Sequence, residues 1–287
     1  MMISQLPALP CYLNGAFTTI DKAQVSVMDR GFIFGDGVYE VVPIHRGKPF
    51  RMLDHLSRLE GSLQETRIAN PHSCAEWQAI FEGLSQTSDA AQDYLIYLQV
   101  TRGVALRDHV MPTDITPTVF AFIQPMKAVS AQTRSAGVAC VSSEDFRWLK
   151  AHIKSTSLLG AVFARQISFD EGCLETLMFR GDLLSEAAAS NVWVVKNGKV
   201  IGPKSDHRVL RGIRYGLIET ICHNQGLVFA LRDITRAEVL AADELMLSSA
   251  TKEVLPITQL DGAAVGNGKP GPIYAKLYEG YQVLKSA

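Results

Sequence analysis

The sequence lacks several features that would place it at once in a large class of proteins. Its five cysteines are odd in number and none stands in a C-x-x-C pair, which disfavours a disulfide framework and a zinc site. No stretch approaches the roughly 18 apolar residues of a membrane span. The N-terminal MMISQLPALPCYLNG lacks the basic start and apolar core of a signal peptide. These absences favour a reduced, cytoplasmic protein that spans no membrane.

Charge imbalance and the common catalytic motifs are also missing. The 28 Lys+Arg and 29 Asp+Glu leave a formal net charge of −1, so no general attraction to nucleic acid or acidic membranes is expected. The sequence contains no G-x-S-x-G and no H-E-x-x-H, and the glycines of RGFIFGDG (30–37) do not match a Rossmann or Walker phosphate loop. A serine hydrolase and a metal site are therefore not indicated.

The length predicts about two domains. The chain has 287 residues, and its 47% hydrophobic and 20% charged residues are ordinary for folded proteins. Hydrophobic periodicity lapses between 124 and 137, where Pro, Ser and Gly gather in QPMKAVSAQTRSAG. We predict a smaller N-terminal α+β domain over 1–126, an interdomain linker over 127–136 and a larger C-terminal domain over 137–287.

Local patterns predict the individual elements. Asn14-Gly15 and Asn197-Gly198 tolerate the positive φ angles of tight hairpins. Leucines recur at helical spacing over 53–63, and Ser73 can cap a helix over 73–84. The other expected helices are 157–169, 209–225 and 271–285, and the other expected strands are 38–44, 94–101, 116–123, 137–143, 244–249 and 253–260.

Lys154 is a candidate for chemistry that needs an uncharged amine. It lies in AHIKSTSLLGAVF, just before a Ser/Thr cluster that opens the expected helix over 157–169. The positive end of a helix dipole and partial burial both disfavour the charged form of a lysine. A neutral amine can attack a carbonyl group to form an imine. By its context alone, Lys154 could also be a solvated loop lysine.

Five further side chains have suitable chemistry, each with an ordinary alternative. Glu186, in DLLSEAAASNVWVV, stands beside small residues where a flat ring could approach, and a buried acid can keep a ring nitrogen protonated; it could also be a polar loop residue. Arg58 points away from the leucine stripe and could bind an anion or be solvated. Arg107 and His109 form an R-x-H step that could clamp a carboxylate or lie on a surface loop. Tyr39 could be a packed or edge tyrosine.

Six stretches of the sequence together resemble the pyridoxal phosphate-dependent aminotransferases of fold type IV, and within them the D-amino acid aminotransferases. They occur in the family's order over most of the chain, and six in register are not expected by chance. The resemblance implies a two-domain fold of α+β and α/β type with the cofactor between the domains. The stretches are DRGFIFGDGVYEVV (29–42), LDHLSRL (53–59), YLQVTRGVALRDHVMP (97–112), RWLKAHIKSTSLLGAVFA (147–164), SEAAASNVW (185–193) and VLRGIRYGL (209–217).

The resemblance also implies how the cofactor, pyridoxal 5'-phosphate, is bound. Lys154 would be the Schiff-base lysine and the catalytic acid/base, carried by the C-terminal domain. Glu186 would pair with the pyridine nitrogen, and Arg58 would bind the phosphate. Additional contacts would come from the backbone N–H groups of Ile213 and Arg214, the hydroxyl of Ser249, the position of Ala250 and the side chain of Leu210 against the ring.

The same resemblance implies a substrate and an assembly. Tyr39, Arg107 and His109 match the carboxylate-binding group of the D-amino acid enzymes, in which the last two come from the neighbouring subunit. We therefore expect a homodimer with shared active sites that exchanges the amino group of a D-amino acid, such as D-alanine, with a 2-oxo acid, such as 2-oxoglutarate. A branched-chain L-amino acid aminotransferase and a 4-amino-4-deoxychorismate lyase are alternatives on the same scaffold. A non-catalytic cofactor-binding protein is an alternative of another class.

Three departures from the family pattern bear on affinity and substrate preference. Ala250 stands where the family usually has a second phosphate-binding hydroxyl, a role that Thr251 could take. Ala187–Ala189 replace a run commonly richer in Gly and Ser. Arg214 replaces a residue that is often Thr and adds a cation near the expected phosphate position.

Overall fold

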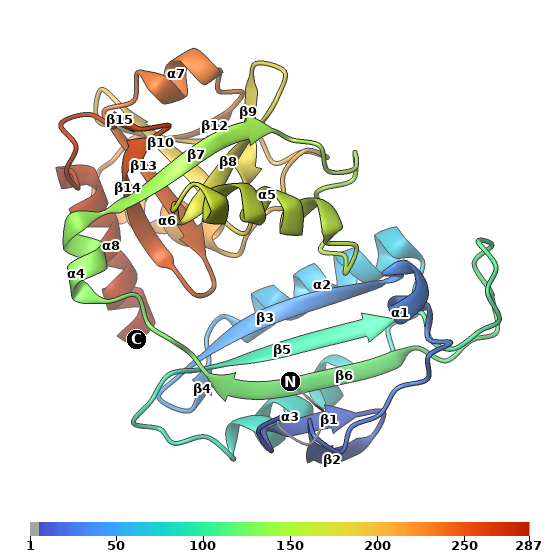
Figure 1. Cartoon of the computed structure of the whole chain (residues 1–287). Coiled ribbons are helices and arrows are strands. Elements are labelled where there is room, and N and C mark those ends of the chain that lie inside the picture. The colour runs from blue at the N-terminus through green and yellow to red at the C-terminus, as the bar shows by residue number, and fades with distance from the viewer. Residues whose placement is uncertain (1–5, 287) are drawn as a thin grey trace. The chain divides into compact units, whose positions relative to one another are not determined.

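The computed structural model describes residues 6–286 and contains two compact units, each with its own hydrophobic core (Figure 1). The first unit runs up to Lys127 and also includes Ile153–Leu158. The second unit comprises Ala128–His152 and the chain from Leu159 onward. The five cysteines are free thiols. Within residues 6–286, no helix has the length and apolar character needed to cross a membrane.

A six-stranded antiparallel sheet forms the centre of the first unit, in the order β2-β1-β6-β5-β3-β4 (Figure 1). The helix α2 packs along β3, and α3 packs against β1, β4 and β6. The strands are β1 (Pro10–Leu13), β2 (Ala16–Thr19), β3 (Gly37–His45), β4 (Lys48–Pro49), β5 (Tyr94–Thr101) and β6 (Thr118–Pro125), and the helices are α1 (Arg30–Phe34), α2 (Met52–Thr66) and α3 (Cys74–Ser85).

Short-range sequence signals explain most of these elements. The turn between β1 and β2 is the predicted Asn14-Gly15 pair, with φ of 45° and 99°. Ser73 caps α3 through a complete capping box, which confirms the predicted helix start. The later leucines of α2 are buried as predicted, but Leu53 is 60% exposed. The predicted stripe is wrong at that end, because Leu53 lies in the first turn and Met52 packs against the core instead.

A nine-stranded mixed sheet forms the centre of the second unit. The strand order is β12-β11-β10-β13-β14-β7-β8-β9, with β15 beside β14. β7 lies parallel to β8 and β14, and β11 lies parallel to β12. The strands are β7 (Val138–Glu144), β8 (Glu175–Arg180), β9 (Leu183–Ala187), β10 (Asn191–Lys196), β11 (Lys199–Pro203), β12 (Phe229–Arg232), β13 (Glu244–Ser249), β14 (Glu253–Leu260) and β15 (Ala263–Ala264), and the helices are α4 (Ala131–Ala136), α5 (Leu159–Asp170), α6 (Arg214–Asn224), α7 (Arg236–Leu240) and α8 (Pro272–Ser286).

In the second unit, the predicted bounds of the strands agree with the structure more closely than the predicted bounds of the helices. β13 and β14 have the predicted bounds, and Asn197-Gly198 joins β10 to β11. α4 lies within the segment predicted as a linker, where Ser130 caps it. The predicted starts of α5 at 157 and α6 at 209 are wrong, because both helices begin later. Before α6, the backbone of Leu210 bonds to side chains instead of continuing a helix.

The segment Ile153–Leu158 packs with the first unit, although second-unit residues precede and follow it in the sequence. It pairs with β3 through the backbone. The Lys154 carbonyl accepts from the Tyr39 N–H at 2.9 Å, and the Thr156 N–H donates to the Gly37 carbonyl at 2.9 Å. The predicted division placed Lys154 in the C-terminal domain, whereas these bonds attach it to the first unit.

Candidate functional site

The Lys154 amine lies over an aromatic ring of the first unit. Its Nζ is 4.0 Å from the centre of the Tyr39 ring, and the side chain is half-buried. Among residues 6–286, no hydrogen bond or ion pair engages Nζ. The helix predicted to follow Lys154 begins only at Leu159, as α5, so the effect of its dipole on the amine stays a prediction. The structure therefore brings Lys154 and Tyr39 together and leaves the amine accessible to covalent chemistry.

Arg58 is held by a buried carboxylate. Its Nε and Nη2 donate to the two oxygens of Glu40, each at 2.7 Å, and His55 Nδ1 lies 2.7 Å from Glu40 Oε2. Glu40 is 1% exposed. Burial would raise the pKa of Glu40, but Arg58 and His55 outweigh it and hold that pKa well below its usual value. The two-bond geometry fixes the direction of the guanidinium, so the solvated alternative for Arg58 is wrong. Its phosphate contact stays a prediction.

The R-x-H step lies on the exposed loop between β5 and β6, as its surface alternative predicted, but the loop is anchored to α1. The Arg107 guanidinium is 5.5 Å from the centre of the Phe34 ring, and the His109 ring is 5.4 Å from it. Arg30 covers the same ring at 4.8 Å, and its Nη1 donates to the Asp108 carbonyl at 2.6 Å. Phe34 and Arg30 therefore position both predicted side chains.

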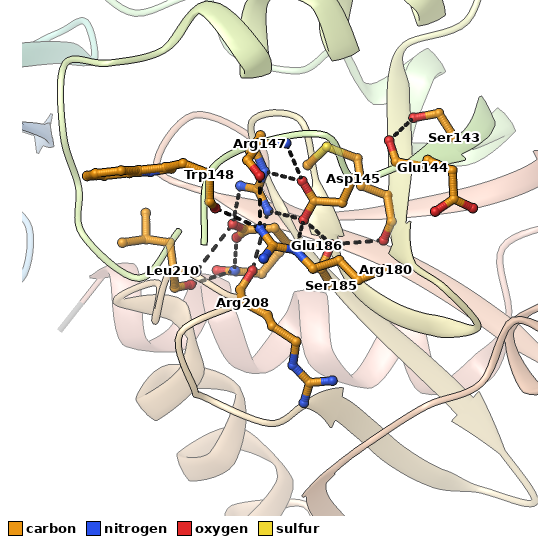
Figure 2. Close-up of polar contacts among 12 residues, drawn as sticks. Ser143, Glu144, Asp145, Arg147, Trp148, Arg180, Ser185, Glu186, Arg208 and Leu210 are labelled. Carbon is orange, nitrogen blue, oxygen red and sulfur yellow. Dashed lines mark hydrogen bonds and ion pairs between the residues drawn. The ribbon is translucent and has the colours of Figure 1, made fainter. Parts of the chain in front are cut away.

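A buried ionic network surrounds Glu186 on the second unit (Figure 2). Glu186 lies on β9 with 5% exposure, and its Oε1 accepts from Arg147 Nη1 at 2.6 Å. Arg147 also donates from Nε and Nη2 to Asp145, each at 2.9 Å, and Arg180 Nε donates to that carboxylate at 3.0 Å. Burial opposes ionisation of Asp145, but Arg147, Arg180 and Ser185 outweigh it and lower its pKa to about 2. For Glu186, burial outweighs Arg147 and the pKa is raised.

The predicted phosphate-binding residues of the second unit lie at the start of α6 and at the turn after β13. Arg214 begins α6 and Ile213 precedes it, at a helix end where the first N–H groups have no partner within the helix. The Ser249 hydroxyl lies 3.5 Å from that of Thr251. Arg214 Nη2 donates to the Ala250 carbonyl at 3.4 Å and so links the turn to the helix. The phosphate-binding roles themselves stay predictions.

Asn191 joins Glu186 to the chain that enters α6. Its Nδ2 donates to Glu186 Oε2 at 3.1 Å and to the Leu210 carbonyl at 2.9 Å. The Leu210 N–H donates to Glu186 Oε1 at 3.2 Å. Two of the three residues are predicted site residues, and Asn191 fixes their relative positions.

Sequence reasoning missed the partners that hold the predicted residues. Glu40, Asp145, Arg147 and Asn191 each bond to a predicted residue or to its partner. One signal was present: Glu40 is the only charged residue in the otherwise apolar VYEVV, where a carboxylate on a buried strand needs a cation. No group of three or more His, Cys, Asp or Glu side chains within residues 6–286 could hold a metal ion.

Residues 37–260 match the sequence family described as Amino-transferase class IV. The D-alanine aminotransferase of Listeria monocytogenes is 36% identical over 270 residues, which covers 93% of this chain and 93% of that protein. The D-alanine aminotransferase of Staphylococcus haemolyticus is 33% identical over 271 residues, which covers 94% and 95%. The chain belongs to the class IV aminotransferases. It is therefore a pyridoxal phosphate-dependent enzyme, as predicted.

A solved structure confirms the predicted fold class of this aminotransferase. The branched-chain aminotransferase of the archaeon Thermoproteus uzoniensis, solved with norvaline, superposes with a TM-score of 0.88. The match covers 98% of this chain and 96% of that chain at 22% sequence identity. Such low identity establishes the shared fold and carries no information about the substrate.

The side chains of the aminotransferase fit a pyridoxal phosphate. The Lys154 amine is not engaged by another polar group of the described chain. A carboxylate offers about four acceptor positions, two on each oxygen. On Glu186, Arg147 and the Leu210 N–H occupy the two positions of Oε1, and Asn191 occupies one position of Oε2. The position left on Oε2 can accept an N–H from the cofactor ring.

We expect Gly212→Ala to disturb this aminotransferase through Asn191. A Cβ at position 212 would lie 2.1 Å from Asn191 Oδ1, so Asn191 must move and loosen its bond to Glu186. Urea unfolding should show a loss of about 1–3 kcal/mol, and titration of the apoprotein should show weaker cofactor binding. Gly216→Ala is the matched control, because a Cβ there meets no atom within 4 Å. Equal behaviour of the two variants would contradict the prediction.

Proposed function

We propose that this aminotransferase exchanges the amino group of a D-amino acid, such as D-alanine, with a 2-oxo acid, such as 2-oxoglutarate. The observation that carries the proposal is its identity of 33–36% to D-alanine aminotransferases over more than nine-tenths of the chain. The contact between Lys154 and Tyr39 supports it, because it places a predicted catalytic amine beside a predicted substrate-binding residue.

Each predicted cofactor-binding residue has a defined part in the proposed reaction. Bound pyridoxal phosphate supplies a carbonyl carbon that takes the amino group and a ring that accepts electrons. The Lys154 amine would bond to the cofactor. Once displaced by substrate, it would take the proton from the α-carbon of the amino acid and pass it to the cofactor carbon that holds the amino group, and in the return half of the exchange it would move a proton from that carbon to the α-carbon of the 2-oxo acid. Glu186 would keep a proton at the ring nitrogen.

Several of the predicted residues would hold the phosphate. Arg58 would donate its guanidinium, and Ile213 and Arg214 would donate their backbone N–H groups at the start of α6. The Ser249 hydroxyl would add a donor, and Leu210 would pack against the ring. Because Ala250 has no hydroxyl, Thr251 would supply the second side-chain donor of this turn.

The substrate carboxylate would be bound by Tyr39 and by Arg107 and His109 of a second copy of the chain. The loop that carries the last two supports such a homodimer. It exposes Leu106 (87%) and Val110 (72%) beside the two polar residues, and exposed apolar side chains that gather in one place are typical of a protein interface.

The alternatives differ in the substrate that they consume. The branched-chain aminotransferases among the structural neighbours are only about one-fifth identical and share the fold. The D-alanine aminotransferases are more similar to this chain in sequence. The R-x-H step, which matches the carboxylate-binding group of the D-amino acid enzymes, also favours a D-amino acid over a branched-chain L-amino acid as the substrate. A 4-amino-4-deoxychorismate lyase would use the same lysine and ring but would release pyruvate.

We expect D-alanine to react with 2-oxoglutarate at least about 10²-fold faster than L-alanine, because the wrong hand misplaces the α-hydrogen relative to the Lys154 amine. The measurement is the rate of pyruvate formation with each enantiomer, with 4-amino-4-deoxychorismate tested beside them. Faster turnover of L-alanine would overturn the stereochemical assignment. Pyruvate from 4-amino-4-deoxychorismate without an added 2-oxo acid would favour the lyase.

A further inference from the structure

The Arg147 side chain makes the shortest hydrogen bond to Glu186 among the described residues, at 2.6 Å, and it has no part in the proposed reaction. All three nitrogen atoms of its guanidinium donate hydrogen bonds: Nη1 donates to Glu186 at 2.6 Å, and Nε and Nη2 each donate to Asp145 at 2.9 Å (Figure 2). Its side chain is 13% exposed, and that of Asp145 is fully buried. Arg147 therefore presents a charged donor to Glu186 in one fixed direction.

The two oxygens of Glu186 have different surroundings. Oε1 accepts from Arg147 and from the Leu210 N–H, which fills it. Oε2 accepts only from Asn191 among the described residues and keeps one position. A ring N–H that bonds to Oε2 would therefore share the carboxylate with Arg147, each on its own oxygen.

A proton shared by a carboxylate and a pyridine nitrogen stays on the more basic of the two. Burial makes Glu186 more basic, and Arg147 makes it less basic because a nearby cation favours the ionised carboxylate. Asp145 weakens that influence by partly neutralising Arg147. Resting on the proposed role of Glu186, we propose that Arg147 is a positioning residue that keeps the shared proton on the cofactor ring nitrogen. A protonated ring accepts electrons and a neutral one does so poorly, so Arg147 acts on the reaction through Glu186.

Two substitutions should shift the pKa of Glu186 in opposite directions. Arg147→Gln removes the cation and should raise the pKa of Glu186 above that of the unaltered protein. Asp145→Asn leaves Arg147 in place with less compensation and should lower it. Arg180→Gln is the matched control, because Arg180 bonds to Asp145 but not to Glu186. General damage to the fold would move the first two variants in the same direction.

The first measurement uses the apoprotein. The side-chain carboxyl carbon of Glu186, labelled with ¹³C and assigned through Glu186→Gln, is followed by NMR as the pH is changed. We expect a higher midpoint in Arg147→Gln, a lower midpoint in Asp145→Asn and a small change in Arg180→Gln. The inference would be overturned if the titration midpoints of Arg147→Gln and Asp145→Asn moved in the same direction, or if neither midpoint moved.

The second measurement uses the holoenzyme loaded with cofactor labelled with ¹⁵N in its ring. In the unaltered protein the ¹⁵N signal should be that of a protonated nitrogen, and in Arg147→Gln it should move to that of a neutral one. Arg147→Lys, which keeps the charge, should restore the protonated signal. If Glu186→Gln shifts the signal and Arg147→Gln does not, the role of Arg147 is wrong while that of Glu186 stands. If Glu186→Gln leaves the signal unchanged, the assigned role of Glu186 fails first.

Discussion

Replacing Lys154 by alanine should give a folded protein that binds no cofactor covalently and has lost nearly all turnover. The amine is the proposed bonding group and the proposed proton carrier, so its removal should lower turnover by about 10⁴-fold or more. Folding should change little, because the Lys154 side chain is half-buried and Nζ contributes only its contact with the Tyr39 ring. The expected cost is about 1 kcal/mol of unfolding free energy.

The decisive measurement is borohydride reduction followed by mass spectrometry of the peptides. The unaltered protein should carry a pyridoxyl adduct on Lys154, and Lys154→Ala should carry none. Lys150→Ala is the control, because Lys150 is an exposed lysine in the same stretch of sequence and should leave adduct and turnover unchanged. An adduct on another side chain of the unaltered protein would contradict the assignment.

The sequence predicted elements well where the signal is local. The capping box at Ser73 and the hairpin at Asn197-Gly198 depend on a few neighbouring residues, and both were predicted at their observed positions. The start of α6 was misplaced because it depends on distant side chains. Asn191 and Glu186 bond to the backbone at Leu210, and no pattern within 209–225 reveals those bonds.

The candidate site also combines features that the sequence predicts with contacts between distant residues that it does not predict. Lys154 and Glu186 were predicted from the resemblance together with the chemistry that each residue type permits, and their roles stay predictions. Their surroundings were not found, because each contact joins segments that are far apart in the sequence. Arg147 meets Glu186 across 39 positions, and Glu40 meets Arg58 across 18. A charged residue within an apolar strand indicates that a partner exists without indicating which residue it is.

Glu40→Gln should cause one of the largest losses of stability of any single substitution in the first unit. Glu40 is 1% exposed and accepts two bonds from Arg58 and one from His55. Removing its charge takes away the carboxylate that the Arg58 guanidinium, 16% exposed, contacts with two hydrogen bonds. We expect a loss of about 3–5 kcal/mol in urea unfolding at pH 7. Glu82→Gln, at an exposed position of α3, should change the unfolding free energy by less than about 0.5 kcal/mol.

The loss should depend on pH in a defined direction. Arg58 and His55 lower the pKa of Glu40 in the folded state against the opposing effect of burial. The unfolded chain therefore takes up the Glu40 proton first as the pH falls. The stabilisation is present above the unfolded pKa of about 4.3 and disappears progressively below it. Glu40→Gln should accordingly show a smaller decline in stability than the unaltered protein as the pH is lowered from 5 to about 3.

A double substitution separates the ion pair from the shape of the site. Arg58→Met together with Glu40→Gln removes both charges, so no uncompensated guanidinium remains, and part of the stability should return relative to Glu40→Gln alone. Cofactor binding should not return, because Arg58 is the proposed phosphate ligand. Recovery of cofactor affinity in the double variant would show that Arg58 supports the fold and does not bind the phosphate. If stability returns and cofactor affinity does not, the Arg58 guanidinium has two roles: it pairs with Glu40 in the fold and it binds the cofactor phosphate. Glu40 is then the group that fixes the direction of the guanidinium.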